Sequence, residues 1–500
     1  MANGKLPSYL ASAVPNPATN RAPWYKNTAQ TYAGIMLWFV FWNQVPLGSG
    51  LKGADGYSGF AGGTLAQGLA VAILSLIAAA LICHFLFYLV PGMLGMKTGL
   101  PLYIVGTSTY GAQGGFLMPG FLMGLLQFGW LAVNAFFAGI LLCAPFGYGF
   151  PSVPHAVVAS VWIVLGAFMG VKGIKYVASV ATFLPLIPLG ILAILFVATV
   201  GGIGSFDSQA LVKAGEQFTP AAGEAIKAQP ALSVFGVLAL IATYVVGFFA
   251  TAGAAGADFG MNNRNSKDVH LGGLVGIALS TVFAGGLALL VVAGAYGGGK
   301  VLSGAILEPT RLMGSIVGDK TAAVFMYLLA IAAFPPACFS AFIAANSFRT
   351  TLPKVPPWIS CGLGALVAIV LAVRGWAGDA IGVFGIIGAS FGPVCGAMMA
   401  DYLLSGGKWS GPRAGFNPAG WISWALGFAV GAAGFIASLI SWVLGLVGIG
   451  GADFITDLAG KVPCPPVAAF VVGFVLYMIL AKAGLQSRTL QMPAAGAQRA

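Results

Sequence analysis

The charged residues of this chain lie almost entirely in the gaps between a dozen long apolar segments. Three of these segments, Phe121–Cys143, Tyr176–Val200 and Ala322–Ala345, each contain twenty residues or more without a charge. A helix that rises ~1.5 Å per residue crosses a hydrocarbon core of ~30 Å in about 20 residues. Only 7% of the residues are charged, against ~25% in soluble domains. The pattern therefore predicts a polytopic, all-α integral membrane protein.

We predict twelve membrane-spanning helices, and the charges between them indicate their orientation. The ranges are 28–50, 62–90, 113–143, 155–171, 176–201, 232–257, 270–296, 321–346, 357–374, 378–404, 416–448 and 464–482. When the gaps are assigned alternately to two sides, the side with both termini has 15 bases and three acids, a net charge of +12. The other side has eight bases and nine acids, a net charge of −1. Because basic loops stay in the cytoplasm, we expect both termini there.

Other function classes find little support in the sequence. The net charge of +11 follows the membrane topology, so we expect no nucleic-acid partner. No two cysteines form a Cys-x-x-Cys pair, and the histidines lie at or near predicted span ends: His84, His155 and His270. We therefore expect neither a metal site nor a disulfide framework. The segment 294–300 resembles a phosphate loop, but Val301 replaces the hydroxyl residue that would bind magnesium. No polar catalytic cluster lies within the spans, so we expect no enzyme.

Two predicted spans combine repeated glycines with aromatic and polar residues at membrane depth. They are the first, 28–50, and the sixth, 232–257. Glycine can interrupt a helix and free backbone groups, which the membrane interior tolerates only where they line a cavity or are buried in protein. Because these spans begin two five-helix halves that cross in opposite directions, they predict the midplane site of a secondary transporter. The alternative is that the glycines only let helices pack closely.

Short motifs follow one another in a fixed order from about residue 20 to residue 480. They are Met96-Lys97-Thr98-Gly99-Leu100, Gln127-Phe-Gly129-Trp130, Ala257-Asp258-Phe259 with Asn263-Arg264-Asn265, and Gly392-Pro393-Val-Cys-Gly396 with Ala400-Asp401-Tyr402. This set resembles the nucleobase–cation symporter-1 family of purine, pyrimidine, hydantoin and allantoin permeases, and most of all its cytosine permeases. The resemblance implies the five-plus-five inverted repeat of the leucine-transporter fold, followed by two C-terminal helices.

The resemblance also implies a division of the chain and a function. The parts are a cytoplasmic N-terminal tail (1–27), a first repeat (28–201), a second repeat (202–404) with an outside loop (202–231), two C-terminal helices (405–482) and a cytoplasmic C-terminal tail (483–500). The implied function is import of a nucleobase-like or related heteroaromatic molecule across the cytoplasmic membrane, by a monomer in the lipid bilayer and without a cofactor. A non-transporting or channel-like protein on the same scaffold, such as a receptor, is the alternative.

The same resemblance assigns substrate-binding residues. Trp130 matches the third-helix tryptophan on which the base stacks, and Gln127 matches the glutamine one turn before it. Phe249, with its neighbour Phe248, matches the aromatic wall on the sixth helix, where the backbone is expected to be unwound. A stack between a base and an aromatic side chain is worth ~1–3 kcal/mol. We therefore expect Trp130 to carry much of the binding energy.

The first and eighth helices depart from the family pattern. Gly34 and Trp38 belong to the predicted substrate site, but Trp38 replaces a small hydroxyl residue. Leu329 stands where the family has an asparagine that hydrogen-bonds the substrate. The loss of this amide argues against cytosine itself as the substrate.

The predicted cation site also departs from the family. Carbonyls of Ala33 and Leu37 are possible sodium ligands, but the two hydroxyl residues of the eighth helix are replaced by Ala332 and Ala333. A hard cation needs about six oxygen ligands, so sodium binding should be weak. The coupling cation, sodium or proton, stays open.

Two acidic residues lie at predicted cytoplasmic span ends. They are Asp258 and Asp401, and the predicted spans have no carboxylate near their middle. We expect each to pair with Arg264 or with a neighbouring loop base, in a structural role.

The charge distribution makes a testable prediction about topology. A reporter that is active only outside the cytoplasm, fused after Ala500, should give no signal, because the terminus is predicted to stay inside. The same reporter inserted in the loop 202–231 should be active and serves as the control. A signal from the C-terminal fusion would contradict the twelve-span arrangement.

Overall fold

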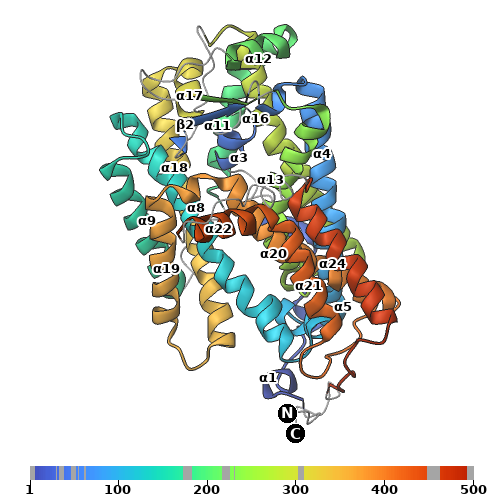
Figure 1. The fold of residues 1–500 in the computed structure, drawn as a ribbon. Helices are drawn as coiled ribbons and strands as arrows, with labels where there is room; N and C mark the ends of the chain where they lie inside the picture. Colours follow the sequence, from blue (N-terminus) through green and yellow to red (C-terminus); the bar gives the residue numbers. More distant parts are fainter. Residues whose placement is uncertain are drawn as a thin grey trace.

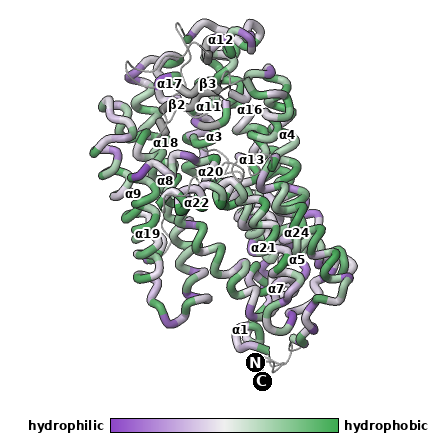
Figure 2. Tube along the Cα trace, viewed as in Figure 1, coloured by the Kyte–Doolittle hydropathy of each residue, from purple (hydrophilic) through white to green (hydrophobic). Residues whose placement is uncertain are grey.

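The computed structural model describes residues 6–29, 31–32, 39–46, 52–53, 56–60, 63–172, 183–216, 226–229, 231–301, 309–446 and 462–492. Within these residues the chain is mostly helical, and the long helices run along the long direction of the molecule (Figure 1). Figure 2 shows hydrophobic residues along the helices and hydrophilic residues gathered toward the two ends. This distribution is that of a multi-pass membrane protein.

Nine helices in the described part of the chain are long and apolar enough to cross a membrane. They are Leu69–Thr98, Phe116–Phe146, Val153–Lys172 (α9), Leu186–Ser205, Val234–Ala254 (α13), Ser266–Gly297, Asp319–Thr351 (α18), Ala380–Leu404 (α20) and Pro465–Lys482 (α24). Four of the nine are composite, with 3-10 or π turns joined to α-helices. The first consists of α4 (Leu69–Ile82), η4 (Cys83–Tyr88) and α5 (Leu89–Thr98), and the second of η5 (Phe116–Phe121), α8 (Leu122–Cys143) and η6 (Ala144–Phe146). The third consists of α11 (Leu186–Thr199) and η7 (Val200–Ser205), and the fourth of α15 (Ser266–Gly273), η8 (Leu274–Leu279) and α16 (Ser280–Gly297).

Three of the predicted spans are not among these nine helices. The ninth is α19 (Pro357–Val373), a helix of 17 residues. The eleventh, predicted as one helix over 416–448, is instead a pair, α21 (Pro418–Gly431) and α22 (Ala433–Leu446), bent by 72° at Ala432. In Figure 1, α22 lies across the long helices rather than along them. The first predicted span is described only in part, and includes α3 (Phe39–Gln44).

Shorter elements connect the spans, and three of them form a small sheet that the all-α prediction missed. The strands are β1 (Lys52–Gly53), β2 (Gly56–Phe60) and β3 (Ile226–Gln229). β2 pairs with β1 antiparallel and with β3 parallel, with Tyr57 opposite Ile226. The remaining short elements are helices: α1 (Ser8–Ala11), η1 (Ala18–Asn20), η2 (Trp24–Lys26), η3 (Gly63–Leu65), α6 (Leu102–Val105), α7 (Thr107–Tyr110), α12 (Ser208–Glu216), α14 (Gly256–Gly260), α17 (Pro309–Val317) and η9 (Trp376–Gly378).

The second span also differs from its prediction, because its helix continues beyond residue 90. It ends at Thr98, where Gly99 takes a left-handed conformation with φ of 68° that favours glycine. His84 therefore lies in the interior of the span and is buried, rather than near the end as predicted.

The N-terminal segment is part of the folded structure. Leu10 in α1 is fully buried, and the amide of Asn16 donates to the carbonyl of Gly99 over 2.8 Å. The side chain of Asn16 donates to Asn262 over 2.8 Å, beyond the end of α14. The segment therefore bridges the ends of the second and sixth predicted spans.

Helix α20 packs between α13 and α24, and glycine makes both contacts close. A Cβ atom on Gly396 of α20 would lie 2.2 Å from the carbonyl oxygen of Phe470 in α24. A Cβ atom on Gly247 of α13 would lie 2.4 Å from the carbonyl oxygen of Phe384 in α20. Such distances are too short for any side chain, so these glycines set how near the helix axes come.

The contact of α20 with α24 predicts the effect of a substitution. Gly396→Val should force the two helices apart at a cost of about 1–3 kcal/mol, because the new side chain would overlap the backbone of Phe470. The control is Gly385→Val on the same helix, since nothing lies within 4 Å of its Cβ position. We expect only Gly396→Val to lower the melting temperature in detergent, and equal melting temperatures would contradict the packing.

Candidate functional site

Helix α8 presents a tryptophan to the two helices that face it. Trp130 is half-buried, and its indole Nε1 donates a hydrogen bond to Oγ1 of Thr251 on α13 over 3.2 Å. Thr251 is itself buried. The hydrogen bond therefore fixes the direction of the ring in the interior of the bundle.

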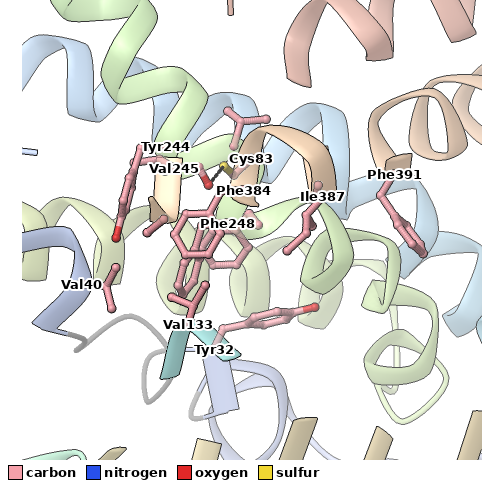
Figure 3. Packing of buried hydrophobic residues seen from close by; sticks show 14 of the residues in the cluster. Tyr32, Val40, Cys83, Val133, Tyr244, Val245, Phe248, Phe384, Ile387 and Phe391 are labelled. Atoms are coloured by element: carbon pink, nitrogen blue, oxygen red, sulfur yellow. Dashed lines mark hydrogen bonds between the residues drawn. The ribbon is translucent and has the colours of Figure 1, made fainter. Parts of the chain in front are cut away.

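Two phenyl rings pack against this tryptophan. The ring of Phe248 on α13 lies 4.7 Å from that of Trp130 and perpendicular to it. The ring of Phe384 on α20 also lies 4.7 Å away, tilted by 31°. Figure 3 shows Phe248 and Phe384 together at the centre of the buried cluster. We call Trp130, Phe248 and Phe384 the aromatic cluster; its rings come from three helices that are far apart in sequence.

Further rings extend the aromatic cluster in both directions. Tyr244 lies 5.1 Å from Phe384, and Phe41 of α3 lies 5.6 Å from Tyr244. On the other side, Phe249 lies 5.7 Å from Phe248 and 6.0 Å from Tyr32. The phenol of Tyr32 donates to the carbonyl of Ala252 over 2.6 Å. The first predicted span is therefore tied to α13 by aromatic contacts on both sides of the aromatic cluster.

The side-chain amide of Gln127 lies one turn before Trp130 and is buried. Its Nε2 atom donates to Sδ of Met123 over 3.6 Å, the one hydrogen bond found for this side chain in the described residues. A thioether is a weak acceptor, so this contact satisfies little of the amide. Gln127 thus keeps donor and acceptor capacity that a polar ligand could use.

The predicted substrate residues are brought together only in part. Trp130 and Phe248 are in contact, and Gln127 is their neighbour on α8. Phe249 is fully buried and points toward Tyr32 rather than to Trp130. Gly34 and Trp38, and the possible sodium ligands Ala33 and Leu37, lie outside the described residues.

The sequence prediction of unwound backbone beside Phe249 is wrong. Helix α13 is continuous from Val234 to Ala254, and the break comes at Ala255, before α14. The glycines of α13 instead allow close packing: Gly247 lies on the backbone of Phe384, and a Cβ atom on Gly253 would lie 2.7 Å from that of Phe87. The glycines within α13 therefore serve close packing, while the interruption of the sixth predicted span lies at Ala255.

Three residues of this site were not predicted from the sequence: Thr251, Phe384 and Tyr244. Thr251 had a weak signal, because it lies one turn after Phe248 and so shares its helix face. Phe384 had no signal in the sequence, since its place beside Trp130 depends on how α20 packs against α13. Tyr244 precedes Phe248 by one turn and could have been included for the same reason as Thr251.

The alanines of α18 lie in a different setting from the aromatic cluster. The carbonyl of Ala333 accepts a hydrogen bond from Nδ2 of Asn134 over 3.0 Å. Oδ1 of Asn134 in turn accepts from the indole of Trp162 over 2.9 Å. Because Pro335 and Pro336 lack N–H groups, the carbonyls one turn before them, at Ile331 and Ala332, lose their helical donors.

Two ion pairs lie away from the aromatic cluster, toward the end of the molecule that carries α1. Asp401 pairs with Arg413 over 3.3 Å, as expected for a neighbouring loop base. Arg264 pairs with Asp268 over 2.9 Å, and not with Asp258 as one of our expectations had it. Asp268 follows Arg264 by four positions and lies in the first turn of α15, so the pair joins that turn to the residue before the helix cap.

No protein-family profile matches this sequence, and no curated protein matches it at a significant level. Solved structures with a similar fold are known. One is the inward-facing conformation of Mhp1, with a TM-score of 0.59, 15% identity, and coverage of 96% of this chain and 97% of Mhp1. Another is Mhp1, described as a nucleobase-cation-symport-1 family transporter, in a closed conformation with bromovinylhydantoin bound; its TM-score is 0.56, with 14% identity and coverage of 95% and 97%. This chain has the fold of Mhp1 over nearly its whole length, which confirms the predicted leucine-transporter-like architecture.

Proposed function

We propose that this chain is a secondary active transporter that imports a neutral heteroaromatic molecule, of the nucleobase or hydantoin kind, by alternating access. The observation that carries the proposal is the aromatic cluster, which lies inside the bundle where α8, α13 and α20 meet. A flat heteroaromatic ring is the ligand that such a cluster suits, because it can stack on Trp130.

The polar groups around the cluster limit the substrate to an uncharged one. Gln127 and Thr251 offer an amide and a hydroxyl, and neither carries a charge. Among the described residues around the cluster, a charged ligand would find no opposite charge to replace its lost hydration, which costs several kcal/mol. An amide and a hydroxyl suit the edge of a heterocycle with ring N–H and C=O groups.

The fold supports movement between two states. Mhp1, which shares this fold, has been observed in an inward-facing conformation and in a closed one with bromovinylhydantoin. In this chain Phe248 and Phe384 already pack on Trp130, so a ligand can stack there only after one of these rings moves away. Entry of the substrate is then coupled to a shift of α13 or α20 relative to α8.

We also propose a cytoplasmic membrane location with both termini inside, and a monomer as the working unit. The charge split between alternate gaps supports the orientation. The aromatic cluster is built from helices of one chain, so the proposed site needs no second copy.

The aromatic cluster predicts how Trp130 variants behave. Trp130→Ala should weaken binding by about five- to a hundred-fold, because a stack worth ~1–3 kcal/mol is lost, while Trp130→Phe should keep part of it. The measurement is a thermal-shift screen of the purified protein against nucleobases, hydantoins, allantoin and vitamin pyrimidines, followed by uptake into proteoliposomes. Trp442→Ala is the control, since Trp442 on α22 is 62% exposed. Normal uptake by Trp130→Ala, or uptake that never exceeds equilibrium, would count against the proposal.

The alanines of α18 predict that uptake depends little on sodium. Neither Ala332 nor Ala333 can offer a side-chain oxygen, and the Ala333 carbonyl is already bonded to Asn134. Replacing sodium by choline at fixed pH should change the initial uptake rate by less than tenfold. Thr at both positions should raise the sodium response, whereas Ile331→Thr, at a position 53% exposed, should not. A tenfold fall (~1.4 kcal/mol of coupling) in the unaltered protein would contradict this prediction.

A further inference from the structure

Asp258 joins two parts of the structure that are far apart in sequence. Its Oδ1 atom accepts a hydrogen bond from the backbone amide of Leu102 over 3.1 Å. Asp258 belongs to α14, directly after the sixth predicted span, and Leu102 begins α6, between the second and third. The carboxyl group therefore holds the end of one span against the linker between two others.

This carboxyl group differs from the other acids at the same end of the molecule. Asp268 and Asp401 each have an arginine partner, at 2.9 Å and 3.3 Å. No lysine or arginine in the described ranges lies within ion-pair distance of Asp258. The titratable groups that face it are the phenols of Tyr32, from the first predicted span, and Tyr103, from α6. Neither phenol supplies a positive charge, so the surroundings favour the neutral acid.

We propose that Asp258 is a proton-binding site, and that the bound proton holds α14 against α6. The neutral acid keeps an oxygen that accepts the Leu102 N–H. When the proton leaves to water, the carboxylate needs hydration that it gains once α14 and α6 separate. The proton bound by Asp258 is then a coupling ion for transport, a role that rests on the function proposed above.

The pKa of Asp258 determines how pH shifts the equilibrium between joined and separated α14 and α6. Burial raises the pKa of Asp258 from 3.8 to about 6, and the Leu102 amide opposes part of the rise. In the separated, hydrated arrangement the carboxyl group returns to an ordinary pKa of ~3.9. The joined arrangement thus binds the proton more tightly and is favoured at low pH. Between pH 5 and 7.5 the equilibrium for separation should rise about tenfold.

Hydrogen exchange of the purified protein tests this without any substrate. The exchange rate of peptides covering 100–106 is measured at pH 5 and pH 7.5 in the unaltered protein and in Asp258→Asn. Asparagine keeps the acceptor for Leu102 but cannot lose a proton, so dividing by its rate removes the intrinsic effect of pH on exchange. We expect the ratio of unaltered to Asp258→Asn rates to rise about tenfold.

The control is Asp379→Asn, at an exposed acid that caps α20 through the amide of Gly382. Asparagine caps helices equally well, so Asp379→Asn should exchange like the unaltered protein. Its rate divided by the Asp258→Asn rate should therefore show the same rise with pH. If Asp258→Asn does not fold, peptides from α24 in the unaltered protein serve as the reference instead. A ratio that stays constant with pH would overturn the proposal. A pH-dependent ratio in a protein that binds no heteroaromatic ligand would leave the proton site standing and refute the proposed function.

Discussion

Close backbone contact between helices is the constraint on which the rest of this structure depends. In lipid, apolar side chains gain little by leaving the solvent, so helices associate through tight packing and hydrogen bonds. Among the glycines at which a Cβ atom would lie within 2.4 Å of a carbonyl oxygen of another helix, four matter most here: Gly95 on Ala257, Gly260 on Gly92, Gly396 on Phe470 and Gly247 on Phe384. The first two join α5 to α14, and the others place α20 between α13 and α24.

The aromatic cluster is a consequence of one of these contacts. Gly247 rests on the backbone of Phe384, and the residue after Gly247 is Phe248. The approach that glycine permits thus brings one ring from α13 and one from α20 to the same depth, where both meet Trp130. The packing of the helices and the geometry of the site are therefore a single property of this chain. A transporter must move these same helices, and few side chains interlock where glycine meets backbone.

Much of the fold followed from the sequence, because apolar length is a direct measure of what the membrane accepts. The bend at Ala432, the small sheet and the continuation of the second helix to Thr98 did not, since each depends on contacts that no apolar run reveals. For the candidate site, the resemblance suggested Trp130 and Gln127. Phe384 came from tertiary packing alone. The unwound backbone expected beside Phe249 was wrong because glycine serves both interruption and close approach, and only the packed structure separates the two uses.

The ion pairs near α1 also depend on packing that the sequence does not reveal. Asp258 and Asp268 both lie near Arg264 in sequence, but Asp268 follows it at the spacing that one helical turn brings together. Asp258 lies on α14, before the turn that leads into α15, and its carboxyl group faces α6 instead. Of these two acids, the arginine pairs with Asp268. Local helix geometry therefore decides the ion pair. Helix α14, which packs closely on α5, carries the acid for which the described ranges show no basic partner.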